Sequence, residues 1–305
     1  MEAIESLLTM QSTMLVLLLA GYVLVKVNVI TPAFRKSLTD FIINFILPCN
    51  IIKSFMIEFN MQIFGDCFIV LLISCGTQAL SIGIGNLLFS RMEAQKKPCI
   101  LYATQVSNAG FLGSPIVEGL YGVQGLLYAS VYSIPQRIMM WSLGVACYSG
   151  SKGKNVIKKV LTHPCIVAVA IGLILMLTQL PLPGWVRQPL TMVGSSNTAM
   201  SLIVIGAVLA EVEPKSMFRK EALFYCLVRL VLIPAIVLVG CLFMHVDRMV
   251  METSVVLAGM PAALTTSILA NQYGRDEKFA VSLIFLSTVG SMITIPLLCL
   301  LMTML

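Results

Sequence analysis

Charged residues are scarce in this chain. They make up 11% of its 305 residues, whereas 58% are hydrophobic and the mean hydropathy is +0.94. Soluble globular domains carry about 25% charged residues, so this composition excludes an ordinary soluble protein. It predicts a polytopic membrane protein instead.

Residues and patterns that bind metals or perform catalysis are also lacking. The sequence has two histidines, His163 and His245, at the ends of apolar segments, and its nine cysteines include no CxxC pair. We interpret the cysteines as small buried apolar residues and expect no metal, no cofactor and no disulfide framework. Hydrolase motifs, phosphate-binding loops and paired carboxylates are absent as well, which argues against an enzyme.

Acidic residues within the apolar segments are few. Asp40, Asp66 and Glu118 lie toward segment ends, where a side chain that reaches to the membrane surface is the simpler interpretation. A proton or sodium relay therefore has little support. The net charge of +6 comes from basic residues spread over short loops, which favours contact with anionic lipid over nucleic-acid binding.

Long apolar segments account for most of the chain. About 20 apolar residues are needed to cross the hydrocarbon core of a bilayer, and ten candidate segments lie between charged or Pro/Gly-rich breaks. They span residues 6–25, 35–57, 63–90, 98–121, 123–148, 161–180, 186–210, 218–244, 249–272 and 278–303. The first should span the membrane rather than act as a removable signal peptide, because Glu2 and Glu5 precede it and no small-residue cleavage site follows.

The basic residues predict an orientation in the membrane. Fifteen of the 20 lie in the odd-numbered loops between segments and three in the even-numbered loops, while Arg137 and Arg229 fall inside segments. Loops rich in lysine and arginine remain on the cytoplasmic side. We therefore expect a multi-pass protein of the plasma (cytoplasmic) membrane with both termini outside.

Five segments on each side of a polar linker imply an inverted repeat. An odd number of crossings makes the second half enter the membrane from the opposite face. The expected fold is an all-α polytopic membrane protein of ten transmembrane helices. Its expected parts are a five-helix repeat over 1–148, a cytoplasmic linker over 149–160 and a second five-helix repeat over 161–305.

Two segments, the fourth and the ninth, should be broken in their middle. Residues 106–115 place a polar pair, two glycines and a proline in an apolar segment, and residues 257–266 contain Gly-Met-Pro. Both are followed by Tyr-Gly, at 121–122 and 273–274. Backbone groups freed inside a membrane must be satisfied by protein, ligand or water, so breaks in corresponding positions of two halves indicate a transport site where the helices cross.

Several polar residues at the breaks are candidate substrate ligands. The amide of Asn108 can hydrogen-bond to a substrate carboxylate. Alternatively, it only hydrogen-bonds to the backbone groups that Gly110 leaves without partners. Ser107 beside it is an alternative ligand or a helix-packing hydroxyl. Thr265 and Thr266 follow the second break, where their hydroxyls can meet substrate or bond to carbonyls of their own helix.

Other polar residues lie in neighbouring segments. Asn50 follows Pro48 and either faces the same cavity or satisfies a proline kink. Gln136 and Arg137 lie near the centre of the fifth segment, where a charge must face a cavity or a partner. Arg137 can attract an anion, pair with Glu118 or cap carbonyls of a broken helix.

Several motifs resemble those of the auxin efflux carrier family, which includes plant auxin carriers and bacterial organic-acid permeases. The matching stretches are residues 108–115 (NAGFLGSP), Leu47-Pro48, Arg229-Leu230 with Pro234, and residues 260–273, which begin Met-Pro and end Ala-Asn-Gln-Tyr. The resemblance implies a scaffold and a transport domain, with segments four and nine crossing at prolines.

The same resemblance implies roles for individual residues. It places Asn108 in the substrate site and Pro261 at the crossover. Plant members have a proline where this chain has Ser107, so the first break should depend on Asn108, Gly110 and Gly113, with Pro115 following them. The short linker favours a prokaryotic-type transporter and makes auxin an unsuitable substrate.

The resulting hypothesis is a secondary transporter of small organic anions, such as mono- or dicarboxylates, that works by elevator-like alternating access. A sodium-coupled symporter of the bile-acid type and a non-transporting membrane sensor are alternatives. The expected partners are the organic anion and the lipid bilayer, with a homodimer as an open possibility.

Overall fold

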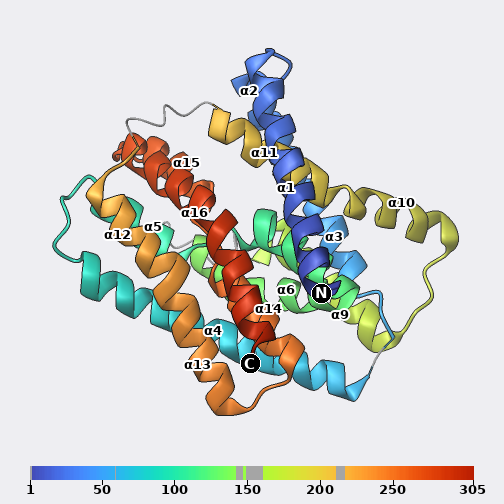
Figure 1. Ribbon diagram of the computed structural model, residues 1–305. Helices are drawn as coiled ribbons and strands as arrows, with labels where there is room; N and C mark the ends of the chain where they lie inside the picture. Colours follow the sequence, from blue (N-terminus) through green and yellow to red (C-terminus); the bar gives the residue numbers. More distant parts are fainter. Residues whose placement is uncertain (1, 59, 142–146, 149–160, 211–216) are drawn as a thin grey trace. The chain divides into compact units, whose positions relative to one another are not determined.

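The regular elements of this protein are helical throughout the part that the structure describes. The computed structural model describes residues 2–58, 60–141, 147–148, 161–210 and 217–305 (Figure 1). An isolated antiparallel β-bridge links Ser107 to Ala262. The all-helical part of the predicted fold class is therefore confirmed, and the predicted linker over 149–160 lies outside the described residues.

The chain divides into two compact units, and each is formed from three separate stretches of sequence. Unit 1 comprises Met1–Cys67, Gly110–Val131 and Leu161–Val212, and unit 2 comprises Phe68–Ala109, Tyr132–Val160 and Glu213–Leu305. Both halves of the sequence contribute to both units. The two units are defined by contacts between residues, whereas the predicted repeats are the first and second halves of the sequence. The units therefore do not test the predicted repeats.

Unit 1 contains the first, second, sixth and seventh predicted segments. Its helices are α1 (Glu2–Lys26), α2 (Pro32–Phe41), η1 (Ile42–Ile46), α3 (Leu47–Ser54), α9 (Pro164–Thr178), α10 (Gly184–Ser195) and α11 (Asn197–Ala210), with the first part of α6 (Ser114–Trp141). Helices α1 and α11 cross in close contact (Figure 1). Gly21 and Gly206 permit this, because a Cβ on either would lie 2.0 Å from a backbone carbonyl oxygen of the other helix.

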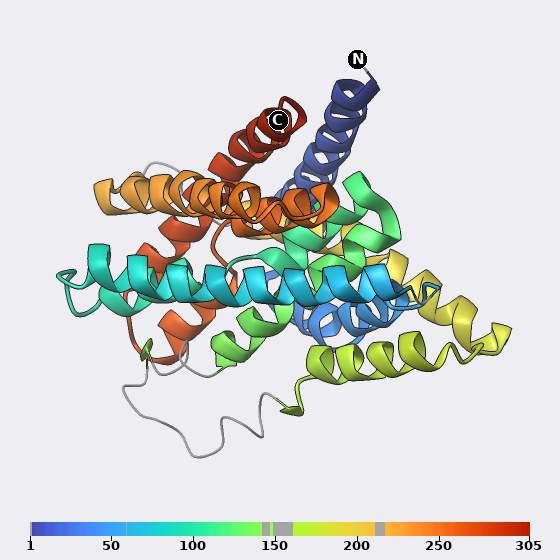
Figure 2. The same cartoon turned by 90° about the horizontal axis from the view of Figure 1, so that it is seen from below.

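Unit 2 contains most of the third segment and the eighth to tenth. Its elements are the greater part of α4 (Met61–Phe89), α5 (Lys97–Gln105), the end of α6, α12 (Lys220–Leu227), η4 (Val228–Leu232), α13 (Ile233–Met244), α14 (Arg248–Ala258), α15 (Thr265–Gln272) and α16 (Glu277–Thr303). Figure 2 shows α4 as one long unbroken helix. Helix α16 contacts α5, α12, α14 and α15 and so lies at the centre of their packing.

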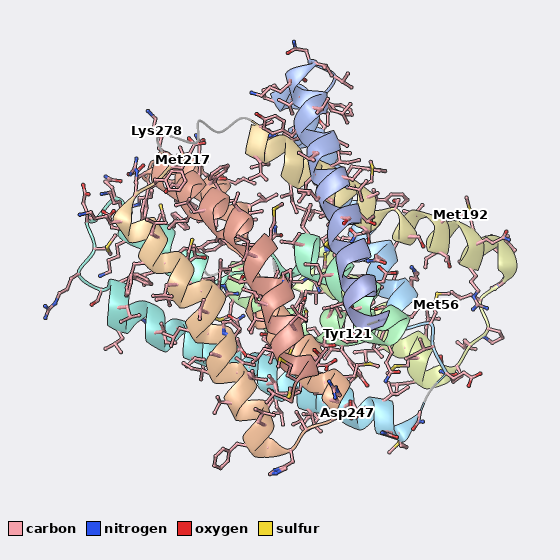
Figure 3. All side chains as sticks on the ribbon, viewed as in Figure 1. Met56, Tyr121, Met192, Met217, Asp247 and Lys278 are labelled. Carbon is pink, nitrogen blue, oxygen red and sulfur yellow. The ribbon has the colours of Figure 1, made fainter. Side chains whose placement is uncertain are left out.

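Four stretches of helix are long and apolar enough to cross a membrane. They are Met61–Phe89, Gly184–Ala210, Lys220–Met244 and Glu277–Thr303 among the described residues. Large apolar side chains remain exposed on several helices; Met192 on α10, labelled in Figure 3, is 73% exposed. Such exposure in a chain of this composition fits contact with lipid. Each of the ten predicted segments contains helix, whereas the count of ten crossings and the inverted repeat remain predictions.

Three π-helices each end two residues before a proline. They are η1 before Pro48, η2 (Ala109–Gly113) before Pro115 and η4 before Pro234. Proline lacks an N–H and its ring crowds the carbonyl four residues earlier, and a wider π turn relieves this contact. Segments two and eight therefore continue as helix through their prolines.

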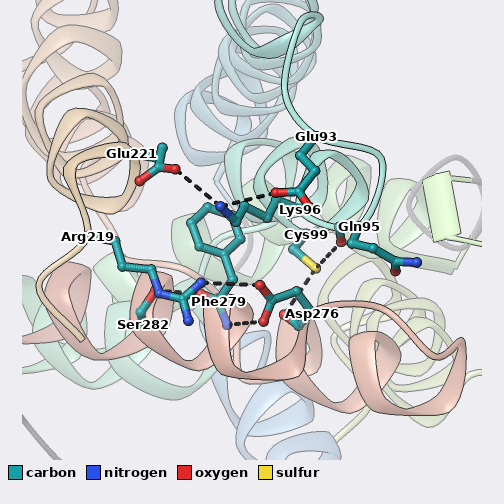
Figure 4. A network of polar contacts seen from close by, with 9 residues as sticks. All are labelled: Glu93, Gln95, Lys96, Cys99, Arg219, Glu221, Asp276, Phe279 and Ser282. Carbon is teal, nitrogen blue, oxygen red and sulfur yellow. Dashed lines mark hydrogen bonds and ion pairs between the residues drawn. The ribbon is translucent and has the colours of Figure 1, made fainter. Parts of the chain in front are cut away.

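A network of ion pairs joins connections of unit 2 that the sequence places on the cytoplasmic side. The Lys96 Nζ lies 3.3 Å from Glu93 Oε2 and 3.3 Å from Glu221 Oε1, at the beginning of α12 (Figure 4). These hydrogen bonds raise the pKa of Lys96 above its ordinary value. The turn before α5 is thereby joined to the beginning of α12.

The ninth predicted loop joins the same network through Asp276. Its Oδ2 lies 3.2 Å from Arg219 Nη1, and its Oδ1 accepts a hydrogen bond from the Phe279 N–H as the N-cap of α16. The ammonium of Lys96 and the guanidinium of Arg219 each lie 5.8 Å from the centre of the Phe279 ring (Figure 4). Cation–π contacts thus add to the ion pairs.

Candidate functional site

The fourth predicted segment is broken where the sequence indicates. Helix α5 ends at Gln105, Val106 is extended with φ −119° and ψ 110°, and η2 begins at Ala109. The ninth segment is broken between the end of α14 at Ala258 and the start of α15 at Thr265. The first break forms with a serine, not a proline, at position 107.

The two breaks pair with each other through their backbones within unit 2. The Asn108 N–H donates to the Pro261 carbonyl at 2.8 Å, and the Ala263 N–H donates to the Val106 carbonyl at 3.2 Å. The Ala262 N–H donates to Ser287 Oγ on α16 at 3.1 Å. Backbone groups freed by the breaks are thus satisfied inside the protein, as an apolar surrounding requires.

Ser107 and Gln136 bind each other at this pairing. Ser107 Oγ donates to Gln136 Oε1 at 2.9 Å, and Gln136 Nε2 donates to the Ser107 carbonyl. Both side chains are buried. The structure therefore brings together two of the predicted ligands, and their polar atoms form hydrogen bonds with each other.

Asn108 and Arg137, the residues that follow this pair in sequence, carry donors that have no partner in the part of the chain that the structure describes. Asn108 is 4% exposed and Arg137 is 7% exposed. Among the described residues, neither Asn108 Nδ2 nor Arg137 Nη1 has a hydrogen-bond partner. A buried donor without a partner costs free energy, so each such group requires an explanation. The Asn108 amide nitrogen does not cap the opened backbone, which was the alternative interpretation of this residue.

The two predicted threonine ligands lie at the beginning of α15. The Tyr102 hydroxyl donates to Thr265 Oγ1 at 2.9 Å, and the Tyr148 hydroxyl donates to the Thr266 carbonyl at 3.0 Å. The rings of these tyrosines meet edge to face, with centroids 5.4 Å apart. Thr265 is therefore bound by Tyr102, whereas Thr266 Oγ1 is buried with no partner among the described residues.

Four predicted residues belong to unit 1. Gly110 and Gly113 lie in η2, Pro115 is the second residue of α6, and Asn50 is buried in α3. The side-chain nitrogen and oxygen of Asn50 have no partner within the described chain. The π-helix η1, rather than Asn50, therefore accommodates the proline at position 48.

Glu118 pairs with Lys53 in unit 1. The Lys53 Nζ lies 2.8 Å from Glu118 Oε1 and donates to Ser195 Oγ at 3.1 Å. Their side chains are 15% and 21% exposed. The partner of Glu118 is therefore Lys53 and not Arg137, whereas its position near a membrane surface stays a prediction.

Sequence reasoning missed a polar face on α4. Ser74, Thr77, Gln78 and Ser81 are all buried, and Ser74 Oγ donates to the Tyr132 carbonyl in the fifth segment. Their i, i+3, i+4, i+7 spacing places them on one side of the helix. That spacing within an otherwise apolar segment was the available signal.

Arg229 was noticed in the sequence but given no role. It is 3% exposed, and its guanidinium donates to two backbone carbonyls, those of Met260 and Thr104. Among the described residues, no group of three or more His, Cys, Asp or Glu side chains is placed to hold a metal ion.

Comparison with known proteins identifies the family of this chain. The model of a family described as "Membrane transport protein" matches residues 7–299. An uncharacterized transporter of Methanothermobacter thermautotrophicus is 27% identical over 296 residues, covering 93% of this chain and 95% of the relative. An uncharacterized transporter of Methanocaldococcus jannaschii is 22% identical over 304 residues, covering 93% and 94%. This chain belongs to the membrane transport protein family, the auxin efflux carrier family that its motifs resemble.

Proposed function

We propose that this protein is a secondary transporter of small organic anions and that its substrate site lies at the paired breaks of unit 2. The observation that carries the proposal is the pair of buried donors, Asn108 Nδ2 and Arg137 Nη1, that have no partner in the described chain. An amide and a guanidinium suit a carboxylate, which accepts up to four hydrogen bonds.

The arrangement of the site supports an anion rather than a cation. Ser107 and Gln136 satisfy each other, and the donors Asn108 Nδ2 and Arg137 Nη1 are left without a partner among the described residues. None of the ion pairs between described residues includes Arg137. A buried positive charge without a counter-ion favours an anionic ligand.

Elevator-like movement is the second part of the proposal. The residues that pair the two breaks, Val106 and Asn108 with Pro261 and Ala263, belong to unit 2, whereas the closely packed α1 and α11 belong to unit 1. In this mechanism unit 2 carries the substrate across the membrane and unit 1 is the scaffold. The ion-pair network around Lys96 and Asp276 would keep unit 2 intact during the movement.

Flux measurements on purified protein in proteoliposomes test the substrate class. We expect counterflow of at least one of acetate, malonate, malate and succinate, measured with and without sodium. Asn108→Ala should raise KM about tenfold to hundredfold, the effect of losing a hydrogen bond to a charged group. Asn44→Ala, which removes an exposed amide of η1 that donates to the Asp40 carbonyl of α2, is the matched control.

The outcomes separate the alternatives. Flux of none of these anions by wild-type protein would rule out the proposed substrate class. Wild-type KM in Asn108→Ala would remove Asn108 from the site. Flux that depends on sodium would favour the bile-acid type of symport, and binding without flux would favour a sensor.

The proposed orientation places both termini outside. Single cysteines in place of Lys97 and Arg248, in a background without the nine native cysteines, should differ in labelling by a membrane-impermeant maleimide on intact cells. We expect labelling at 248 and none at 97. The reverse pattern would invert the topology.

A further inference from the structure

Arg229 contacts the carboxyl ends of both broken helices. Its Nε donates to the Met260 carbonyl at 3.0 Å, and its Nη1 donates to the Thr104 carbonyl at 3.1 Å. Thr104 lies in the last turn of α5, and Met260 lies two residues after the end of α14. One side chain thus bridges the two segments just before the residues that pair with each other.

The chemistry of a helix end explains why a guanidinium suits this position. The last carbonyls of a helix have no partner within the helix, and in an apolar interior they must find one elsewhere. The guanidinium presents several N–H groups in a rigid plane, and its charge is favourable beside the negative end of a helix dipole. Among the described ion pairs none includes Arg229, so these carbonyls are its observed polar partners.

A tyrosine one helical turn earlier extends the same contact. The Tyr225 hydroxyl donates to the Ala103 carbonyl at 2.9 Å, and Arg229 binds the next carbonyl along α5. Both side chains are buried. The eighth segment is thereby fixed against the last turn of α5 at two consecutive residues.

The π-helix η4 places Arg229 for this contact. Pro234 follows η4, and the wider turn shifts the direction in which side chains leave the helix relative to a continuous α-helix. Arg229 is the second residue of η4, and Tyr225 lies in the α-helical part before it. Pro234 therefore affects the direction in which Arg229 leaves its helix toward the two breaks.

We propose that Arg229 is a positioning residue that sets the distance between the two breaks, and through it the placement of Asn108. It acts on the backbone at Thr104 and Met260 and does not bind the substrate. Its effect on transport rests on the function proposed above, whereas its effect on the backbone does not.

Hydrogen exchange of the protein without substrate tests the backbone effect. The reporters are the Asn108 amide, bonded to Pro261, and the Ala263 amide, bonded to Val106. Arg229→Met should speed their exchange about tenfold to hundredfold, because the hydrogen bonds lost are to a charged group. Arg229→Lys, which retains a charge and donors, should lie between Arg229→Met and wild type. Arg91→Met, in an exposed turn of the same unit, should leave exchange unchanged.

Transport provides the second readout. Arg229→Met should raise the KM for the anion that wild type carries, and Arg229→Lys should restore part of the loss. In Arg229→Met, the further change Asn108→Ala should have little effect, because a displaced Asn108 no longer contributes; a double-mutant cycle measures this coupling.

The possible results are distinguishable. Wild-type exchange at both amides in folded Arg229→Met would overturn the positioning role. Faster exchange of α16 along with the reporters would show general loosening and would also overturn it. If wild type moves no carboxylate, the proposed function fails while the exchange data still decide the role of Arg229. Additive effects of Arg229→Met and Asn108→Ala on KM would contradict the proposed role of Arg229 in placing Asn108.

Discussion

The backbone N–H of Asn108 donates to the carbonyl oxygen of Pro261 at 2.8 Å, which joins residues 153 positions apart in the sequence. The Asn108 side-chain nitrogen, Nδ2, has no hydrogen-bond partner among the described residues. The backbone of this residue thus joins the two breaks, while its side-chain amide nitrogen makes no hydrogen bond within the described chain.

Removing the buried charge of Arg137 should weaken anion binding. Arg137→Met is expected to raise the KM for carboxylate about tenfold to hundredfold, the range for a hydrogen bond to a charged group. Arg187→Met removes an exposed arginine from unit 1 and should have no such effect. Flux in proteoliposomes checks both variants, and an unchanged KM in Arg137→Met would exclude this side chain from the site.

Ser107 and Gln136 should act as one unit. Ser107→Ala or Gln136→Leu leaves the other residue with a buried polar group that lacks its partner. We expect each single variant to lower stability by about 1–3 kcal/mol. The double variant should lose less than the sum, with a coupling of about 0.5–3 kcal/mol. Denaturant unfolding in detergent measures the cycle, and strict additivity would show that the two side chains contribute separately.

The Lys53–Glu118 pair should stabilise unit 1. Both side chains are mostly buried, so Lys53→Glu should destabilise by more than the ~1 kcal/mol of an exposed pair and by up to about 3–5 kcal/mol. The exchanged double variant Lys53→Glu/Glu118→Lys should recover part of this loss. Thermal unfolding followed by loss of the monodisperse peak in size-exclusion chromatography is the measurement. If the double variant recovers no stability, the hydrogen bond from Lys53 to Ser195, rather than the charge pair, would account for the loss.

Gly206 should tolerate no side chain. A Cβ there would lie 2.0 Å from the Leu18 carbonyl oxygen, so Gly206→Ala forces α1 and α11 apart. Overpacking of this kind costs about 1–3 kcal/mol. Gly76→Ala and Gly83→Ala are matched controls on α4, because a Cβ at either site meets nothing within 4 Å. In these controls alanine should be neutral or slightly stabilising, since glycine disfavours helix. Equal melting temperatures for all three variants would contradict the close contact.

Much of the local structure followed from residue types. The polar pair and glycines at 107–113 and the Gly-Met-Pro at 259–261 predicted breaks, and both breaks are present. In both Tyr-Gly pairs the glycine has a positive φ, 63° at Gly122 and 60° at Gly274. The glycine is needed there, since positive φ strains other residues.

The sequence alone did not predict which distant residues pair with each other. Arg137 and Glu118 each had several candidate partners, and the choice of Lys53 for Glu118 depends on how α3 and α6 pack. The roles of Tyr102 and Tyr148 beside α15 were missed because nothing in their own segments marks them. A single chain carries no direct record of which helix lies against which.

The sequence by itself determined that this is a helical membrane protein, because composition and segment length depend only on local chemistry, and its motifs resemble those of the auxin efflux carrier family. It also indicated where the helices stop. The tertiary structure alone decided that the breaks pair through Asn108 and Pro261, that Ser107 uses its hydrogen bonds on Gln136, and that Arg229 holds two helix ends. The physical reason is that a buried polar group must find a partner, and only the packing of distant segments determines which one is within reach.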